Sequence, residues 1–227
     1  LMEHIKISFP EITSLLYIVN QKANNTMYDQ DVVCYNGEDY IMEEMDGLHF
    51  KIGAKSFFQT NSEQAKILYR KTKELAQITE NDLVYDLYTG TGTIAQYVAT
   101  SAKKVVGIDS VEEGIKAAYE NTERNNIENC TFYTGDMKEI FTDEFITKNG
   151  NPDVIITDPP RDGMHKKVVE QILKIGAKRI VYVSCNSATQ ARDIALMDEK
   201  YKVIHIQPID MFPQTHHVEN IIVLELK

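Results

Sequence analysis

Short apolar segments alternate with amphipathic helical patterns along most of the chain after Glu80. Strand-like runs recur at residues 83–86, 105–109, 131–133, 154–157, 180–184, 203–207 and 221–226, with helical patterns between most of them. Several of these runs are apolar at successive positions, which suits strands that are covered on both faces. The alternation predicts an α/β fold with a mostly parallel sheet and helices on both of its faces.

The first part of the chain shows a different pattern, in which short apolar runs alternate with clusters of Asn, Asp and Gly. Residues 14–19 and 32–35 are such runs, which are typical of small antiparallel strands joined by turns. From Asn61 the pattern changes, because Asn61 or Ser62 can cap a helix whose apolar stripe continues toward Glu80. We therefore expect a β-rich accessory region at residues 1–58 and a main domain at residues 59–227.

Composition and charge narrow the class of protein. Hydrophobic residues make up 43% of the 227 positions and no apolar run is long enough to span a bilayer, so we expect a soluble, cytoplasmic protein. The start at Leu1-Met2, without a secretory leader pattern, is that expected of an excised fragment. The three cysteines (Cys34, Cys130 and Cys185) form no Cys-x-x-Cys pair, which favours reduced thiols. The formal net charge of -10 argues against this segment gripping a polyanion by itself.

A predicted strand runs into a glycine-rich turn and then a helix pattern at residues 86–99. Gly90, Gly92 and Ala95 match a dinucleotide-binding turn, in which the backbone approaches a ligand closely, but this motif does not separate a nicotinamide cofactor from S-adenosylmethionine. Asp109 ends the next strand 17 positions after Gly92, close to the spacing of about 20 at which a carboxylate binds a ribose diol. Asp109 can instead cap the following helix, predicted at residues 111–118, and it can share both roles with Ser110.

Two further acidic residues follow predicted strands. Asp136 comes after a short strand and is placed to lie by an adenine, unless it is an ordinary loop acid. The Asp158-Pro-Pro-Arg161 segment comes directly after the apolar strand at 154–157, at the carboxyl edge of the sheet, where ligands bind in open α/β folds. Two consecutive prolines continue neither a ladder nor a helix, so we expect a fixed loop that holds a planar base, or else a plain structural turn.

Cys185 stands at the end of the buried strand at 180–184 and before a helix that opens at Ser187. A thiol at a helix N-terminus is close to the positive end of the dipole and to unpaired N–H groups, which favours the thiolate. We therefore expect Cys185 to be a nucleophile. The alternative is a small buried hydrophobic residue, which is the commonest role of a lone cysteine.

A polar segment at residues 211–219 separates the last two predicted strands. His216, His217 and Glu219 suggest metal ligands, but neighbouring histidines on an extended segment are expected to point apart, so we predict no metal site. Glu219 is a better candidate for a general base, because a carboxylate within reach of a substrate can accept its proton. A surface acid is the alternative.

These motifs, in this order, resemble the RNA uridine-C5 methyltransferase family. The resemblance covers residues 51–227 and is carried by Phe58-Gln59, Asp86-Leu-Tyr-x-Gly-x-Gly, Asp109, Asp158-Pro-Pro-Arg161, Ser184-Cys-Asn and His217-x-Glu219. It implies a class I, Rossmann-like methyltransferase sheet, S-adenosylmethionine as cofactor, and transfer or ribosomal RNA as substrate. The cofactor contacts that it implies, together with the glycine turn, are Gln59, Tyr88, Gly90, Thr93, Asp109, Asp136 and Asp158.

The same resemblance implies the chemistry. Cys185 would add to C6 of the base, C5 would take the methyl group, and Glu219 would remove the C5 proton so that the thiol is eliminated. Asp158 or Arg161 would contact the polar edge of a uridine that has left its stack. Members commonly carry an N-terminal RNA-binding β-barrel that this sequence does not show, so we expect RNA recruitment to depend on such a domain.

Departures from the family pattern keep alternatives open. Members often have Cys at the position of Thr89 and Asn at that of Thr93. A nicotinamide-dependent oxidoreductase would explain the glycine turn and Asp109 but not Cys185. An amino-directed methyltransferase fits the Asp-Pro-Pro loop, although Arg161 stands where those enzymes carry an aromatic residue. A non-catalytic RNA-binding module is the third alternative. Substitution of Cys185 separates the methyltransferases, because amino methylation needs no thiol.

Overall fold

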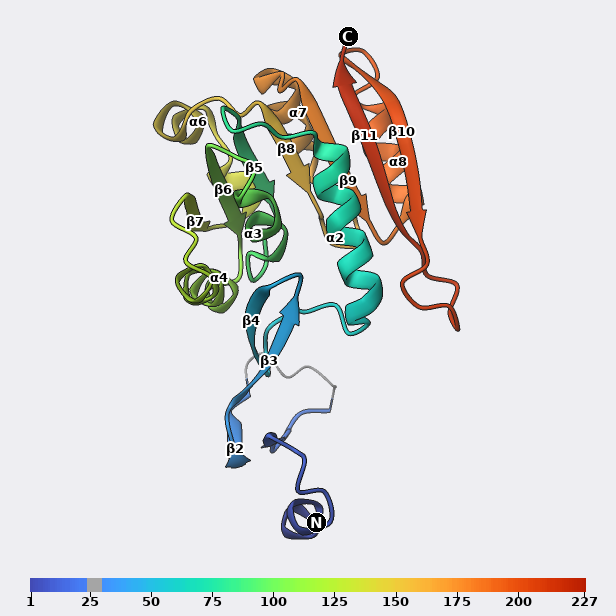
Figure 1. Ribbon diagram of the computed structural model, residues 1–227. Coiled ribbons are helices and arrows are strands. Elements are labelled where there is room, and N and C mark those ends of the chain that lie inside the picture. Colours follow the sequence, from blue (N-terminus) through green and yellow to red (C-terminus); the bar gives the residue numbers. More distant parts are fainter. Residues whose placement is uncertain (24–29) are drawn as a thin grey trace.

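The computed structural model describes residues 1–23 and 30–227 and has a seven-stranded sheet at its centre (Figure 1). Its strands are β5 (Leu83–Leu87), β6 (Lys104–Asp109), β7 (Cys130–Thr134), β8 (Val154–Thr157), β9 (Arg179–Ser184), β10 (Tyr201–Ile209) and β11 (Glu219–Leu226). Their order is β10-β11-β9-β8-β5-β6-β7, in which the last five are parallel and β11 is antiparallel to both of its neighbours. The predicted α/β class with a mostly parallel sheet is confirmed.

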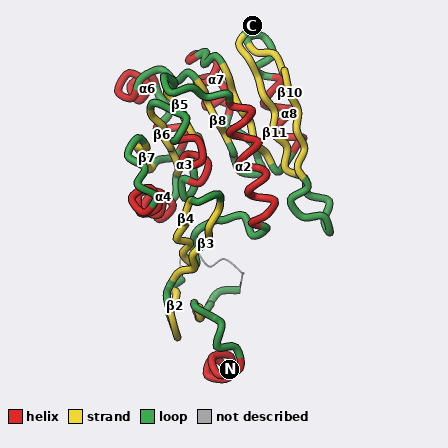
Figure 2. The backbone as a smooth tube through the Cα atoms, viewed as in Figure 1, coloured by secondary structure: helices red, strands yellow, loops and turns green. Residues whose placement is uncertain are grey.

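Helices cover both faces of this sheet (Figure 2). One face, with Val84 and Val105, packs on α2 (Ser62–Ala76), α3 (Thr93–Ala99) and α4 (Glu112–Arg124). The other, with Tyr85 and Val106, packs on α5 (Met137–Ile140), α6 (Asp143–Asn149), α7 (Lys166–Ile175) and α8 (Ser187–Ala195). Successive side chains of a strand point to opposite faces, which separates the two cores. None of the helices in the described residues is both long and apolar enough to cross a membrane.

The N-terminal part forms two small antiparallel pairs that extend away from the central sheet (Figure 1). After α1 (Met2–Ser8), β1 (Ser14–Ile18) pairs with β2 (Val32–Gly37), and β3 (Tyr40–Met45) pairs with β4 (Leu48–Gly53). The small antiparallel strands predicted near residues 14–19 and 32–35 are confirmed, whereas α1 was not predicted. The division of the chain at residue 58 stays a prediction.

Two asparagines of α4 attach the β3–β4 hairpin to the main core. The Lys51 N–H donates to Asn121 Oδ1 at 2.8 Å, and Asn121 Nδ2 lies 3.4 Å from the Lys51 carbonyl oxygen. The His49 N–H donates to Asn125 Oδ1 at 2.8 Å, and Asn125 Nδ2 donates back to the His49 carbonyl at 3.0 Å. Phe50, between these two residues, is fully buried in the core under α2 and α3. The hairpin is therefore held through both its backbone and its side chains.

Two helix boundaries differ from the prediction. Asn61 caps α2 as expected, but the helix ends at Ala76 and does not continue toward Glu80. Gln77 takes a left-handed conformation with φ of 48°, which closes the helix there. The helix predicted at residues 111–118 continues to Arg124.

Candidate active site

The turn between β5 and α3 is open to a ligand at the carboxyl edge of the sheet. Gly90 has φ of 56°, and a Cβ placed there would meet nothing within 4 Å. Gly92 has φ of 74°, but its Cβ would lie 2.9 Å from Ala118 and 3.0 Å from Phe132, so packing requires this glycine. Tyr88 has φ of 65°, a costly conformation for a residue other than glycine and one that concentrates at functional sites. The space for a ligand is therefore above Gly90.

Asp86 supports this turn from below. It is fully buried, and its Oδ2 accepts from the Thr89 hydroxyl at 2.6 Å and from the Ala95 N–H at 3.0 Å. Its Oδ1 has no hydrogen-bond partner within the described part of the chain. Burial raises the pKa of Asp86 to about 7, although the two hydrogen bonds lower it. Asp86 was not among the site residues predicted from the sequence. An acid within the apolar run Leu-Val-Tyr-Asp-Leu would have indicated a buried carboxyl group at this position.

Asp109 lies directly beside the open turn. Its Oδ2 accepts from the Gly90 N–H at 2.9 Å and its Oδ1 accepts from the Val111 N–H at 2.9 Å. Asp109 is not the capping residue of α4, which is Val111, but its bond to the Val111 N–H also fixes the start of that helix. Its bond to the Gly90 N–H holds the same carboxylate next to the space above Gly90, as the ribose-binding prediction requires.

The remaining predicted cofactor contacts have different surroundings. Thr93 is buried, with its hydroxyl 3.2 Å from that of Thr91. Asp136 is exposed, caps α5 and pairs with the Lys138 ammonium at 3.0 Å, and this pairing lowers the pKa of Asp136. Gln59 is buried in the segment that joins β4 to α2. Their roles as cofactor contacts stay predictions.

The side chains of Asp158, Arg161, Cys185 and Glu219 meet where β8 and β9 end and β11 begins. Ser184 pairs with Asn220 across the sheet, which brings Cys185 and Glu219 to the same edge. Burial raises the pKa of the Cys185 thiol, and the Glu219 and Asp158 carboxylates raise it further, whereas the hydrogen-bonded Arg161 side chain lowers it. The structure therefore brings together all four residues that we predicted to contact or transform the substrate.

The pKa values of both carboxyl groups in this cluster are raised. Burial raises the pKa of Asp158 well above its usual range, and the negative charges of Glu219 and Asp86 add to the effect. Burial also raises the pKa of Glu219, although Arg161 opposes this. Arg161 is thus a cationic group that acts on both the thiol and Glu219.

The expectation that α8 favours a Cys185 thiolate is wrong. Asn186 caps this helix, and its Oδ1 accepts from the Ala188 N–H at 3.1 Å, so Cys185 lies ahead of the cap. The Asn186 side chain thus pairs with an N–H group at the start of α8. The net effect of the surroundings of Cys185 is a raised thiol pKa. Arg161 lowers that pKa, in the way expected of the helix dipole.

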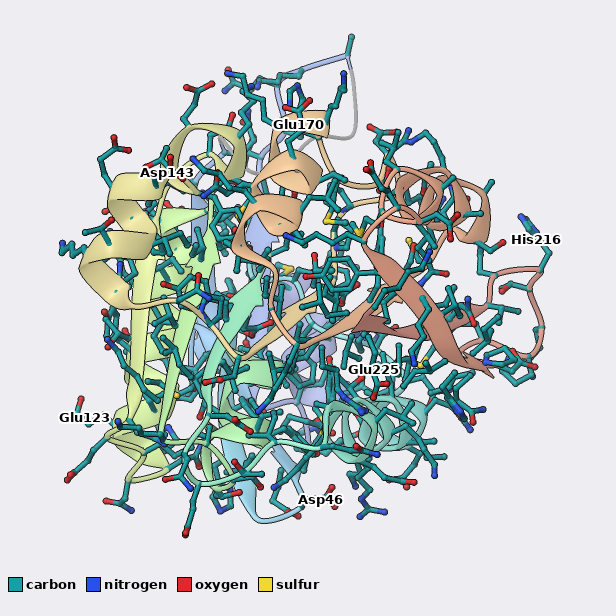
Figure 3. All side chains as sticks on the ribbon, turned by 90° about the horizontal axis from the view of Figure 1, so that it is seen from above. Asp46, Glu123, Asp143, Glu170, His216 and Glu225 are labelled. Carbon is teal, nitrogen blue, oxygen red and sulfur yellow. The ribbon has the colours of Figure 1, made fainter. Side chains whose placement is uncertain are left out.

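The loop between β10 and β11 corrects a second expectation. The rings of His216 and His217 do not point apart, because their centroids are 4.2 Å apart with an interplanar angle of 40°. Figure 3 shows His216 at the periphery of the molecule, on this loop. The charge of His216, burial and Arg161 lower the pKa of His217. No cluster of three or more His, Cys, Asp or Glu side chains that could hold a metal ion occurs in the described ranges.

The chain is similar to known proteins. The family model for tRNA (uracil-5-)-methyltransferase matches residues 17–227. An uncharacterized RNA methyltransferase of Bacteroides thetaiotaomicron is 60% identical over 227 residues, which are 100% of this chain and 50% of that protein. An uncharacterized RNA methyltransferase of Porphyromonas gingivalis is 59% identical over 218 residues, which are 95% of this chain and 47% of that protein.

A solved structure supports the same assignment. The crystal structure of Pyrococcus abyssi tRNA (uracil-54, C5)-methyltransferase in complex with S-adenosyl-L-homocysteine is 35% identical, with a TM-score of 0.83. The match covers 96% of this chain and 52% of that one, so this chain spans about half the length of its relatives. The resemblance carried by the motifs is confirmed, and with it the class I methyltransferase sheet. The chain belongs to the tRNA (uracil-5-)-methyltransferase family.

Proposed function

We propose that this chain is the catalytic part of an S-adenosylmethionine-dependent enzyme that methylates C5 of uridine in RNA, with Cys185 as nucleophile. The observation that carries the proposal is the meeting of the Cys185 thiol with Asp158, Arg161 and Glu219. Uracil C5 is a poor nucleophile until a group adds to C6, so C5 methylation needs a nucleophilic side chain. Methylation of an amino group has no such need, and would leave the placement of Cys185 without a purpose.

The turn between β5 and α3 fits S-adenosylmethionine. Gly90 leaves open space above its Cα, and the Asp109 carboxylate beside it suits a ribose diol. The proposed contacts are completed by Gln59, Tyr88, Thr93, Asp136 and Asp158. When bound, the cofactor would supply an electrophilic methyl group on a positively charged sulfur.

Each residue of the cluster has a defined task in the proposed reaction. The Cys185 thiolate adds to C6, and the electron pair of the C5–C6 double bond moves toward the C4 oxygen. Asp158, in the protonated form that its raised pKa favours, is suited to donate a hydrogen bond to that oxygen. C5 then accepts the methyl group. Glu219 removes the C5 proton, the double bond re-forms and the thiolate leaves, and the raised pKa of Glu219 makes its carboxylate the stronger base.

We propose transfer RNA as the first substrate to test and ribosomal RNA as the second. The family description and the Pyrococcus abyssi neighbour both name tRNA. The net charge of -10 gives this chain little attraction for phosphates. RNA recruitment is therefore proposed to rely on a separate RNA-binding domain.

The test is to trap the covalent intermediate. The chain is mixed with S-adenosylmethionine and an RNA that carries 5-fluorouridine, and a protein–RNA adduct is sought on a denaturing gel. Fluorine at C5 cannot be removed as the proton is, so the adduct accumulates. Cys185→Ala should abolish it, whereas Cys34→Ala, which alters an exposed thiol far from the site in sequence, should not.

The outcomes separate the candidate functions. An adduct that requires Cys185 supports the substrate base, the nucleophile and the reaction class together. Absence of an adduct with both transfer and ribosomal RNA, from this chain and from a protein of the relatives' full length, would refute uridine C5 methylation. Methyl transfer that survives Cys185→Ala would favour an amino-directed enzyme.

A further inference from the structure

The loop that carries Arg161 is attached to α8 by two side chains. Asn186 Nδ2 donates to the Arg161 carbonyl oxygen at 3.1 Å, and the Thr189 hydroxyl lies 3.0 Å from the same oxygen. That hydroxyl also lies 3.1 Å from the Asn186 carbonyl, and its single proton serves one acceptor at a time. The Ser184 hydroxyl is 3.1 Å from the Asn186 carbonyl, so it can pair this oxygen when Thr189 donates to Arg161. Both donors can thus act on Arg161 together.

A second anchor holds the far end of the same loop. The Met164 N–H donates to Oδ2 of the buried Asp193 at 2.7 Å, and the Tyr182 hydroxyl donates to that oxygen at 2.8 Å. The Arg192 guanidinium donates to Asp193 Oδ1 at 2.7 Å and to the Asp162 carbonyl at 2.8 Å. The middle and the far end of the loop between β8 and α7 are therefore fixed to α8.

These contacts link the loop to the nucleophile, because Asn186 follows Cys185 directly in the chain. Asn186 uses its Oδ1 to cap α8 and its Nδ2 to hold Arg161. We propose that Asn186 and Thr189 are positioning residues, which fix the Arg161 backbone so that its guanidinium faces the Cys185 sulfur. This inference rests on the proposed function only in giving Cys185 a catalytic task. Its test needs neither RNA nor cofactor.

The charges around the thiol give the proposal a measurable consequence. Cys185 faces two carboxylates, Glu219 and Asp158, and one cation, Arg161. Burial and the carboxylates raise the thiol pKa, and the Arg161 side chain lowers it. If the backbone of Arg161 is released, its guanidinium spends less time at the sulfur and the pKa of the thiol rises further. A purely structural contact would change stability without moving this pKa.

The experiment measures alkylation of Cys185 by iodoacetamide as a function of pH, with the modified peptide quantified by mass spectrometry. Thr189→Val removes the hydroxyl and keeps the shape, Thr189→Ser keeps the hydroxyl, and Ser187→Ala removes an exposed hydroxyl from the same turn. Alkylation follows the thiolate. We expect Thr189→Val to move the midpoint upward by about 0.5–1 pH unit, part of the 1–3 units that a neighbouring opposite charge contributes. Below the midpoint the rate should fall about 3- to 10-fold.

Two comparisons make the result decisive. Thr189→Ser and Ser187→Ala should keep the wild-type midpoint, and the exposed Cys34 provides an internal standard in every sample. Asn186→Ser keeps a good helix cap but cannot reach the Arg161 carbonyl, so its midpoint should also move upward. An unchanged midpoint in both Thr189→Val and Asn186→Ser, with a wild-type circular dichroism spectrum, would overturn the proposal.

A double variant tests whether the effect passes through Arg161. Arg161→Gln should raise the midpoint at least as much as Thr189→Val does. Residues that act through one another give non-additive changes, so Thr189→Val should shift the midpoint no further in the Arg161→Gln background. A full additional shift in that background would show that Thr189 acts independently of Arg161, and the proposal would fail.

Discussion

Glu219 has opposite effects on two steps of the proposed reaction, the attack by Cys185 and the removal of the C5 proton. Its carboxylate raises the pKa of Cys185, which disfavours the nucleophile, and the same carboxylate is the proposed base of the last step. Glu219→Gln removes the charge and keeps the shape, so the thiol pKa should fall. We expect the midpoint of Cys185 alkylation to move downward by about 0.5–1 unit. With ordinary RNA, the variant should form the covalent intermediate and release little 5-methyluridine, and a midpoint that moves upward would exclude this electrostatic account.

Asp86 predicts an unusual dependence of stability on pH. Burial raises its pKa from 3.8 to about 7 in the folded chain, so the folded state binds this proton more tightly than the unfolded state. The stability that the proton contributes is complete below about pH 4 and is lost as pH rises through about 7. Since one pKa unit corresponds to about 1.4 kcal/mol, the loss is on the order of a few kcal/mol. In Asp86→Asn, urea unfolding at about pH 5 and pH 8 should therefore show a smaller difference than in the wild type.

Asp82 provides a matched control of opposite sign. Asp82 directly precedes β5, whereas Asp86 lies within that strand, near its end. The Asp82 carboxylate accepts hydrogen bonds from Lys178 and from the N–H and hydroxyl of Thr79. Burial raises the pKa of Asp82, but these donors outweigh burial and the net shift is downward. The stability that Asp82 contributes is present at neutral pH and lost on acidification. Asp82→Asn should thus weaken the fold at neutral pH, and equal pH profiles for the two variants would refute this assignment.

The sequence predicted which residues meet at the site better than it predicted their electrostatic states. Cys185, Glu219, Asp158 and Arg161 were recognised from local motifs. The topology brings them together at one sheet edge, because Asp158 and Cys185 directly follow strands, Glu219 begins one, and Arg161 lies in the loop after Asp158. The raised thiol pKa was not predictable, since it depends on burial and on carboxylates that are distant in the chain. The contact between the His216 and His217 rings was not predictable either, because it depends on the conformation of their loop.

At the scale of elements, the pairing of α4 with β4 is a test of how buried amides hold a strand. Asn121 is fully buried and serves the N–H of Lys51, whereas Asn125 is partly exposed and serves His49. An unpaired buried backbone group costs about 1–3 kcal/mol. Asn121→Ala should therefore lower the free energy of unfolding by about 2–3 kcal/mol. Asn125→Ala leaves the exposed His49 groups to water but also removes the donor to Oε1 of the fully buried Gln96, so its loss should be of similar size. Urea unfolding measures both.

The control for this pair is Glu123→Ala, which alters an exposed position of the same helix. A surface substitution of this kind changes stability by about 0.5 kcal/mol or less. Losses at Asn121 and Asn125 no larger than that of Glu123→Ala would show that these amide contacts do not hold the strand.

Regular elements were predictable where their signals are local. All of the predicted strands of the main domain occur, because runs such as Val154–Thr157 are mostly apolar and are bounded by turn residues. The early end of α2 depends on one residue, Gln77, whose left-handed conformation has no strong sequence preference. The docking of β4 on α4 joins residues about 70 positions apart, such as Lys51 and Asn121, and no local pattern encodes it.

At the scale of the whole molecule, the net negative charge of the chain is unfavourable for binding the proposed RNA substrate. The chain carries 24 basic and 34 acidic residues, while the proposed substrate is a polyanion. Several cations are also paired with acids, as in Lys116 with Glu112 and Lys174 with Asp143. The two ends of the chain lie at opposite ends of the molecule (Figure 1), so the N-terminal strands extend the structure away from the sheet. The site therefore has little electrostatic help from its own domain in attracting RNA.

This imbalance predicts a weak dependence of RNA binding on salt. For single-stranded nucleic acid the logarithm of the binding constant falls with the logarithm of salt concentration with a slope of about -0.7 per phosphate neutralised. Contacts limited to Arg161 and its neighbours would neutralise about one to three phosphates, which gives a slope no steeper than about -2. Fluorescence anisotropy of a labelled RNA, titrated between about 50 and 200 mM salt, measures it. A protein of the relatives' full length should show a steeper slope if a separate domain recruits the RNA. A slope for this chain alone steeper than about -4 would reveal a cationic surface and remove the need for such a domain.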